Sequence, residues 1–169
     1  MPLREFDELP DDARLWIFEA DRKIGCDEGN TVVDGLDEFL ERWTAHGQGL
    51  FAARDWKHDR FIFVAVDQSA AGASGCSIDA LYRFIKDLGN RLGASFIGNQ
   101  GVSYRDGDRS LRVSREEFSR LATSGEVGPD TIVFDNTLTT VGDLREGKWE
   151  VPAGDSWHGK AFFRTTARS

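Results

Sequence analysis

The sequence lacks several features from which function is usually inferred. It has two cysteines, too few for the disulfide framework of a small secreted domain. It contains no G-x-x-x-x-G-K-[ST] loop, the motif that holds phosphates in P-loop ATPases. No apolar run approaches the roughly 20 residues that cross a bilayer as a helix. These absences argue against a disulfide-stapled scaffold, a P-loop ATPase and a helical membrane protein.

Positive charge is also scarce, with 21 Lys and Arg against 29 Asp and Glu and a net charge of −8. Nucleic acids and anionic membranes select clustered basic residues, so we predict neither as a partner. The acidic first residues lack the pattern of a signal peptide, which predicts the cytoplasm. The histidines, His46, His58 and His158, are far apart and form no metal-binding pair, so we predict no metal and no cofactor.

The most informative segment is an apolar run, Arg60 to Asp67, that leads through small residues into a predicted helix start carrying Cys76. Such a turn presents free backbone N–H groups and the positive end of a helix dipole. It is therefore a candidate anion site, and an environment of the kind that lowers the pKa of a thiol.

Hydrophobic spacing over residues 1–100 predicts an α+β fold. Expected strands cover 14–21, 50–55, 60–67 and 95–102, and expected helices cover 31–45 and 78–92. The order βαββαβ is that of a ferredoxin-like two-layer sandwich. Asn30 or Thr31 can cap the first helix, and Gly93 ends the second.

The strand 60–67 is apolar on both faces and should be central, but the two helices cover only one face. The rest of the chain, or a second subunit in a homodimer, must cover the other. The aromatic tail supplies a candidate cover through Trp149, Trp157, Phe162 and Phe163. An exposed aromatic patch that binds a peptide is the alternative interpretation of the tail.

Residues 101–169 predict a second, smaller module that packs against the first. A hairpin turn at 104–108 precedes a capping box, Ser114 to Glu117, and a short helix that ends at Gly125. A turn at 128–130 then leads into a strand over 131–134.

Two family resemblances involve these segments. The stretch from Val102 to about Leu144, with its Asp-Gly turn, Ser-Arg-Glu-Glu-Phe, Pro-Asp-Thr and Ile-Val-Phe, resembles the bacterial GYF-like domains. That resemblance implies a small α/β module that binds a protein or peptide partner. In place of the aromatic residue that usually follows the last strand, this chain has Asn136-Thr137-Leu138.

The whole chain also resembles a bacterial family of uncharacterised proteins of similar length, some of them labelled ABC-transporter ATPases. The matching segments are 43–47, 65–67, 72–79, 129–131 and 155–157. The missing phosphate-binding loop gives the ATPase label no support. No functional residues are carried over from this family.

The predicted topology brings a thiol, an imidazole and a carboxylate to one edge of the sheet. His46 ends the first predicted helix, and Asp67 and Cys76 flank the loop that follows the third strand. These three side chains are the candidate catalytic group, with Cys76 as nucleophile and His46 as its base. The candidate ligand-binding residues of this edge are Gly72, Ser74, Gly75, Ser77, Asp79 and Arg14.

A purely structural interpretation competes with the catalytic one. Ser74 or Ser77 can cap the helix, and Cys76 can be a small buried apolar side chain. His46 can cap the first helix at its C-terminus, and Asp67 can bond the backbone of its own loop.

Three classes of function remain open from the sequence. A non-catalytic interaction or adaptor protein is favoured, because no complete catalytic group is visible. The alternatives are a sensor of a small anionic ligand through loop 72–79, and a thiol-dependent hydrolase or transferase that uses Cys76 with His46.

Overall fold

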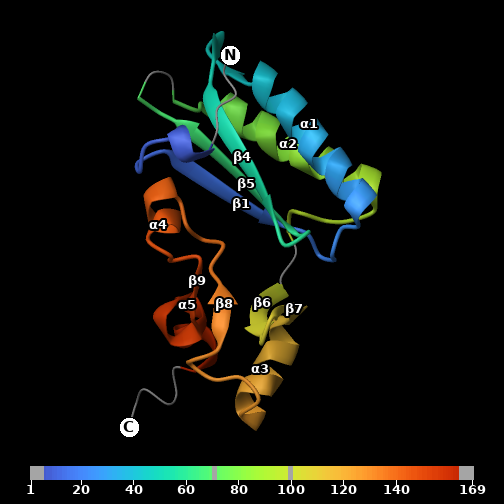
Figure 1. Ribbon diagram of the computed structural model, residues 1–169, viewed down its shortest axis with the longest axis vertical. Helices are drawn as coiled ribbons and strands as arrows, with labels where there is room; N and C mark the ends of the chain where they lie inside the picture. The colour runs from blue at the N-terminus through green and yellow to red at the C-terminus, as the bar shows by residue number, and fades with distance from the viewer. Residues whose placement is uncertain (1–5, 70–71, 99–100, 164–169) are drawn as a thin grey trace. The chain divides into compact units, whose positions relative to one another are not determined.

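The computed structural model describes residues 6–69, 72–98 and 101–163, which form a mixed α and β structure in two compact units (Figure 1). Unit 1 comprises Met1–Asn99 and Thr137–Glu146, and unit 2 comprises Gln100–Asn136 and Gly147–Ser169. The expected α+β class is confirmed. The division differs from a single boundary at residue 100, because the chain returns to unit 1 at 137–146.

A three-stranded antiparallel sheet forms the centre of unit 1, with the order β1 (Arg14–Glu19), β5 (Phe61–Asp67), β4 (Phe51–Lys57). The side chains from Phe61 to Val66 are all fully buried. Because successive side chains of a strand point to opposite faces, β5 is buried on both of its faces. The predicted central strand is confirmed.

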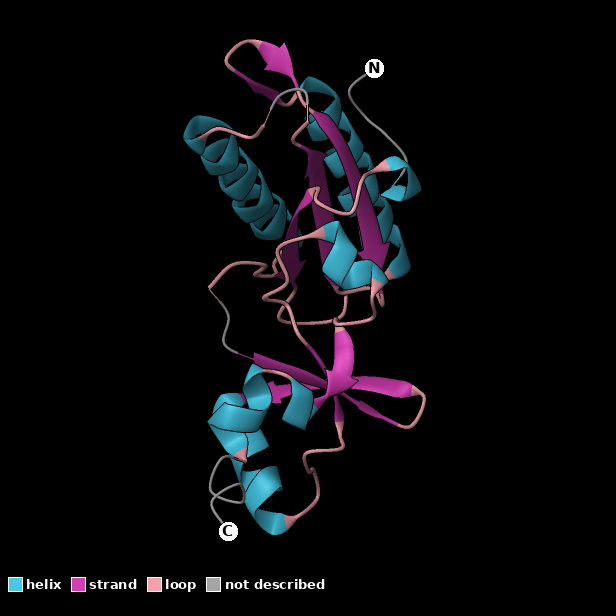
Figure 2. Cartoon of the chain, turned by 90° about the vertical axis from the view of Figure 1, so that its left-hand side faces the viewer, coloured by secondary structure: helices cyan, strands magenta, loops and turns pink. Residues whose placement is uncertain are grey.

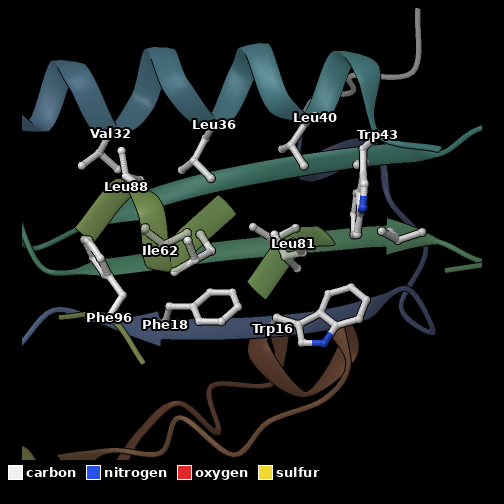
Figure 3. Close-up of a cluster of buried hydrophobic side chains, with 14 of the residues drawn as sticks. Trp16, Phe18, Val32, Leu36, Leu40, Trp43, Ile62, Leu81, Leu88 and Phe96 are labelled. Atoms are coloured by element: carbon white, nitrogen blue, oxygen red, sulfur yellow. The ribbon is translucent and has the colours of Figure 1, made fainter. Parts of the chain in front are cut away.

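Helices α1 (Cys26–Arg42) and α2 (Gly75–Leu92) cover one face of this sheet. Their apolar residues recur every three or four positions, so one stripe of each helix faces the strands. Figure 3 shows this layer, in which the helices contribute Val32, Leu36, Leu40, Leu81 and Leu88, and the strands contribute Trp16, Phe18 and Ile62.

Helix α1 begins earlier than predicted, at Cys26, and its N-cap is Gly25 instead of Asn30 or Thr31. Glu28 explains the shift, because its carboxylate accepts a hydrogen bond from the Gly25 amide at 3.4 Å. Glu28 also pairs with Arg22 at 3.1 Å, and this ion pair lowers the pKa of the Glu28 carboxyl. Polar residues therefore start the helix before its apolar stripe begins.

The fourth strand predicted over 95–102 does not form in the sheet of unit 1. Residues 95–98 have no strand, 99–100 lie outside the described residues, and β6 of unit 2 begins at Gly101. The free edge of β1 is instead met by a later segment, since the Leu15 amide donates to the Thr139 carbonyl at 2.9 Å. Thr140 forms a bridge with Arg14 in the same place.

The second face of the sheet carries the short helices η1 (Phe6–Glu8) and α4 (Val141–Arg145), opposite α1 and α2 (Figures 1 and 2). We call residues 137–146, which contain α4, the arm. Arm amides at Val141 and Gly142 donate to the carbonyls of Ala13 and Asp11 at 3.0 and 2.7 Å. Arg145 adds an ion pair with Asp11 at 2.7 Å. Within the described residues of unit 1, η1 and the arm lie on this face.

Unit 2 is built on a four-stranded sheet of order β7-β6-β8-β9. Its elements are β6 (Gly101–Asp106), β7 (Arg109–Ser114), α3 (Arg115–Ser124), β8 (Ile132–Phe134), β9 (Glu150–Pro152), η2 (Ala153–Asp155) and α5 (Trp157–Phe162). The predicted hairpin and short helix are both present. Ser114 caps α3 by accepting from the Glu117 amide, but the Glu117 carboxylate binds Arg120 and does not close a capping box.

Part of the aromatic tail belongs to the core of unit 2. Phe162 and Phe163 contact the ring of Phe118 at centroid distances of 4.9 and 6.3 Å. Trp149 is buried and packs on Phe134 at 4.8 Å. The tail is folded, as expected, and its role as a cover of the unit 1 sheet stays a prediction.

The close packing at the end of α2 gives a stability prediction. A Cβ atom at Gly89 would lie 2.6 Å from the Ala94 carbonyl oxygen. Gly89→Ala should therefore destabilise the protein by about 1–2 kcal/mol, although alanine is the better helix former. Gly75→Ala, where nothing lies within 4 Å, is the control and should be neutral in urea unfolding. Equal unfolding free energies for both variants would contradict the packing.

Candidate functional site

An open hollow of about 470 Å³ lies in unit 1 where the end of α1 meets the start of α2. A short hairpin, β2 (Thr44–Ala45) and β3 (Gln48–Gly49), stands beside it. The residues that line the hollow are Phe39, Arg42, Trp43, Thr44, His46, Ser74, Cys76, Ser77 and Ala80. Its volume falls in the range of small-molecule sites.

Trp43 fixes the two helix ends relative to each other. It is the C-cap of α1 and only 3% exposed. Its indole Nε1 donates to the Ser77 carbonyl in the first turn of α2 at 2.8 Å. One buried hydrogen bond therefore ties the end of α1 to the start of α2, on the inner side of the hollow.

The start of α2 is capped by two serines. The Ser74 hydroxyl accepts from the Ser77 amide at 3.2 Å, and the Ser77 hydroxyl accepts from the Ser74 amide at 2.7 Å. The predicted capping role of both serines is confirmed. Within the described residues, the amides of Gly75 and Cys76 have no acceptor. Two N–H groups at the positive end of the helix dipole are therefore free for a ligand.

Cys76 is exposed on the rim of the hollow, so its interpretation as a buried apolar side chain is wrong. Cys26, the first residue of α1, is an exposed thiol in a similar position. The two helix starts differ in charge, because Asp27 and Glu28 follow Cys26 whereas the first turn of α2 has no acidic residue. Cys26 is thus an internal reference for the chemistry of Cys76.

His46 lies in the turn of the hairpin and does not cap α1, which ends at Arg42 with Trp43 as its C-cap. Both His46 and Gly47 have positive φ, 53° and 80°, as a two-residue type I′ turn requires. The hairpin carries the exposed imidazole to the rim of the hollow, opposite the start of α2. The predicted proximity of His46 to the cysteine-bearing helix start is thus observed, through a different local structure.

Arg42 adds a second nitrogen-bearing side chain to the lining. Its guanidinium pairs with Glu38 at 3.2 Å, and both side chains are 73% exposed. An ion pair this exposed is weak, so an anionic ligand can compete with Glu38 for the guanidinium.

The remaining predicted site residues do not line the hollow. Asp67 accepts from the amide and hydroxyl of Ser69 at 2.9 and 2.7 Å, as its structural interpretation expected. Arg14 lies over the ring of Trp16 at 4.8 Å. Gly72, Gly75 and Asp79 are exposed and are not among the lining residues.

Sequence reasoning missed the contribution of α1 to the hollow. Phe39 and Trp43 are one helical turn apart and fit the apolar spacing of the helix predicted over 31–45, which indicates core, and nothing in the sequence sets Arg42 or Thr44 apart. One sequence signal could have indicated these residues. The apolar stripe of the helix ends at Trp43, and side chains near the end of a helix can leave the core.

The geometry supports binding better than catalysis. Cys76 and His46 share the hollow, but no carboxylate lines it to orient the imidazole. Over residues 6–69, 72–98 and 101–163, no group of three or more His, Cys, Asp or Glu side chains could hold a metal ion. In the same part of the chain, no helix is long and apolar enough to cross a membrane.

Comparison with family models, curated proteins and solved structures gives no match to this chain. The proposal that follows therefore depends on the residues of the hollow and their physical chemistry.

The indole of Trp43 provides a test of how the hollow is held. Trp43→Phe removes the hydrogen bond to the Ser77 carbonyl and should destabilise the protein by about 2–3 kcal/mol. Trp56→Phe is the control, because the half-buried Trp56 indole packs at the edge of the same core and its Nε1 has no acceptor among the described residues. We expect a loss of about 1 kcal/mol there. Equal losses by urea unfolding would show that the hydrogen bond contributes nothing.

Proposed function

We propose that this protein is a non-catalytic binding protein, and that unit 1 takes a small molecule with an anionic group in the hollow between α1, the β2–β3 hairpin and α2. The observation that supports the proposal most directly is the free amide of Cys76 in a hollow that Arg42 and His46 also line, with the free amide of Gly75 next to it in the same helix start. Amides at a helix start and a guanidinium are the groups that bind carboxylate and phosphate.

The wall of the hollow indicates what the rest of the ligand resembles. Phe39 and Trp43 lie with their ring centroids 5.7 Å apart, and Ala80 adds a small apolar surface. An apolar or aromatic body attached to the anionic group would bury surface against these side chains. A small organic acid fits this combination better than a strongly hydrated inorganic ion.

The charge of unit 1 limits the size of that anion. Unit 1 contains 20 of the 29 acidic residues and 12 of the 21 basic ones, so the whole net charge of −8 falls on it. This field repels polyanions over distances of about a Debye length, ~8–10 Å. A monoanion held by short-range hydrogen bonds is therefore favoured over a nucleotide or nucleic acid.

We also propose a fold family for each unit, ferredoxin-like for unit 1 and GYF-like for unit 2. The order β1-β5-β4, with α1 and α2 on one face, supports a ferredoxin-like assignment in which the fourth strand is missing. The GYF-like resemblance proposes unit 2 as the module for a protein or peptide partner. Tyr82, 40% exposed, is the single exposed large apolar side chain of the described residues, so an adaptor role would use a surface other than an aromatic patch.

An NMR titration tests the anion site with two probes, inorganic phosphate and benzoate. We expect saturable shifts of the Gly75 and Cys76 amides, with Kd values of about 1–10 mM for an unoptimised probe. Benzoate should bind more tightly than phosphate because its ring can pack on Phe39. Arg42→Gln and His46→Gln should each weaken binding about threefold or more.

The start of α1 serves as a control in the same spectrum, because it is a helix start followed by Asp27 and Glu28. Shifts of equal size at Cys26 and Cys76, or no saturation by about 50 mM, would contradict the site.

A second candidate function, a thiol-dependent hydrolase or transferase, is favoured by one observation: Cys76 is exposed and shares the hollow with His46. Iodoacetamide labelling separates the two functions. If the site only binds, Cys76 and Cys26 should react at rates within about threefold of each other, and benzoate should protect Cys76 alone. The enzyme would be favoured if Cys76 is alkylated at least about 30-fold faster than Cys26 and if His46→Gln removes this difference.

A further inference from the structure

Unit 2 contains a histidine in an unusual position for a titratable side chain. His158 lies in α5 and is 1% exposed. Its ring stacks on Trp157 at a centroid distance of 3.9 Å and faces Phe118 and Phe162, each at 6.4 Å. The imidazole is therefore part of an aromatic cluster, where a charged ring would lose its hydration.

One hydroxyl links the ring of His158 to the start of α5. The Ser156 hydroxyl accepts from the His158 amide at 3.2 Å and lies 2.7 Å from Nδ1. Its single proton can point to the Ala153 carbonyl at 3.1 Å or to Nδ1, so this contact suits either ring tautomer. The environment of the imidazole is therefore set by its burial among aromatic rings.

The charged groups around the ring only partly offset its burial. Arg115 of α3 lies over Trp157 at 4.8 Å and opposes a positive charge on His158, whereas Asp135, which follows β8, favours it. The other charged residues of the adjoining elements are Asp155 of η2, Lys160 of α5, and Glu116, Glu117 and Arg120 of α3. Burial prevails, and it lowers the pKa of His158 to about 4.

We propose that segment 153–163 is an acid-released latch, which leaves the rest of unit 2 as the pH falls and uncovers the aromatic side chains around Phe118. The segment is suited to this movement, because its helix α5 is only six residues long and depends on its packing for stability. Its release would expose Phe118 and Tyr104, which are 0% and 9% exposed in the closed state.

The sign and size of the effect follow from proton linkage. Once released, His158 binds a proton with an ordinary affinity, near pH 6.5, whereas in the latch it stays neutral until about pH 4. Stability of the closed latch is complete above pH 6.5 and is lost progressively as the pH falls to about 4. Between pH 7 and 5 the open population should rise about 20-fold.

Hydrogen exchange of the full chain, corrected for intrinsic rates, tests the proposal. We expect amides of 157–163 to have protection at least about tenfold lower than those of β6, and to lose about 20-fold in protection between pH 7 and 5. His158→Gln and His158→Phe cannot take up the proton and should change less than about twofold. His58→Asn, at an exposed histidine, is the control and should behave as the parent protein.

Two results would overturn the latch. Protection at 157–163 equal to that of β6 at pH 5 would show that the segment opens only when unit 2 unfolds as a whole. An undiminished pH response in both His158 variants would show that another group is responsible.

Discussion

The burial of β5 on both faces is the constraint on which the architecture depends. A strand whose six side chains from Phe61 to Val66 are fully buried needs a cover on each side. Helices α1 and α2 supply one cover from the neighbouring sequence. The other face carries η1 and the arm, and the arm is separated from β5 by about 70 residues of chain. Hydrophobic burial in unit 1 thus depends on a segment that the chain reaches only after it has begun unit 2.

This arrangement links the two units covalently at three points of the chain. The arm is the connection between β8 and β9, which pair with each other in unit 2. The two ends of that connection are hydrogen-bonded to each other, since the Asp135 amide after β8 donates to the Trp149 carbonyl before β9 at 2.7 Å. On the helical side of the sheet, the Trp43 indole joins the end of α1 to the start of α2, and the hollow lies at that junction.

Much of the fold was predictable because local patterns agree with the final contacts. The all-apolar β5, the stripe of α2, its end at Gly93 and the hairpin before α3 follow from periodicity and turn chemistry. The absence of a fourth strand was not predictable from residues 95–98, because their composition is strand-like. The edge of β1 near Leu15 is instead occupied by the arm, which lies far away in the sequence. The arm itself has a short helix with a weak pattern, and its partners are more than 100 residues away.

The site was predictable only in part. Cys76, Ser74 and Ser77 were found from the small-residue turn and helix start, and His46 was placed near them by topology. Arg42 and Phe39 were missed because a helix residue that lines a hollow and one that faces solvent or core have the same sequence pattern. The direction of a side chain at a helix end depends on where the helix stops, here at the Trp43 cap.

The central claim is that the arm holds unit 1 together. The most direct measurement is hydrogen exchange of the full chain after residues 137–146 are replaced by a Gly/Ser linker of equal length. The account predicts that β1 and β5 lose protection by about 100-fold, while β6 and β8 stay within a few-fold of the parent protein. Unchanged protection of β1 and β5 would contradict it.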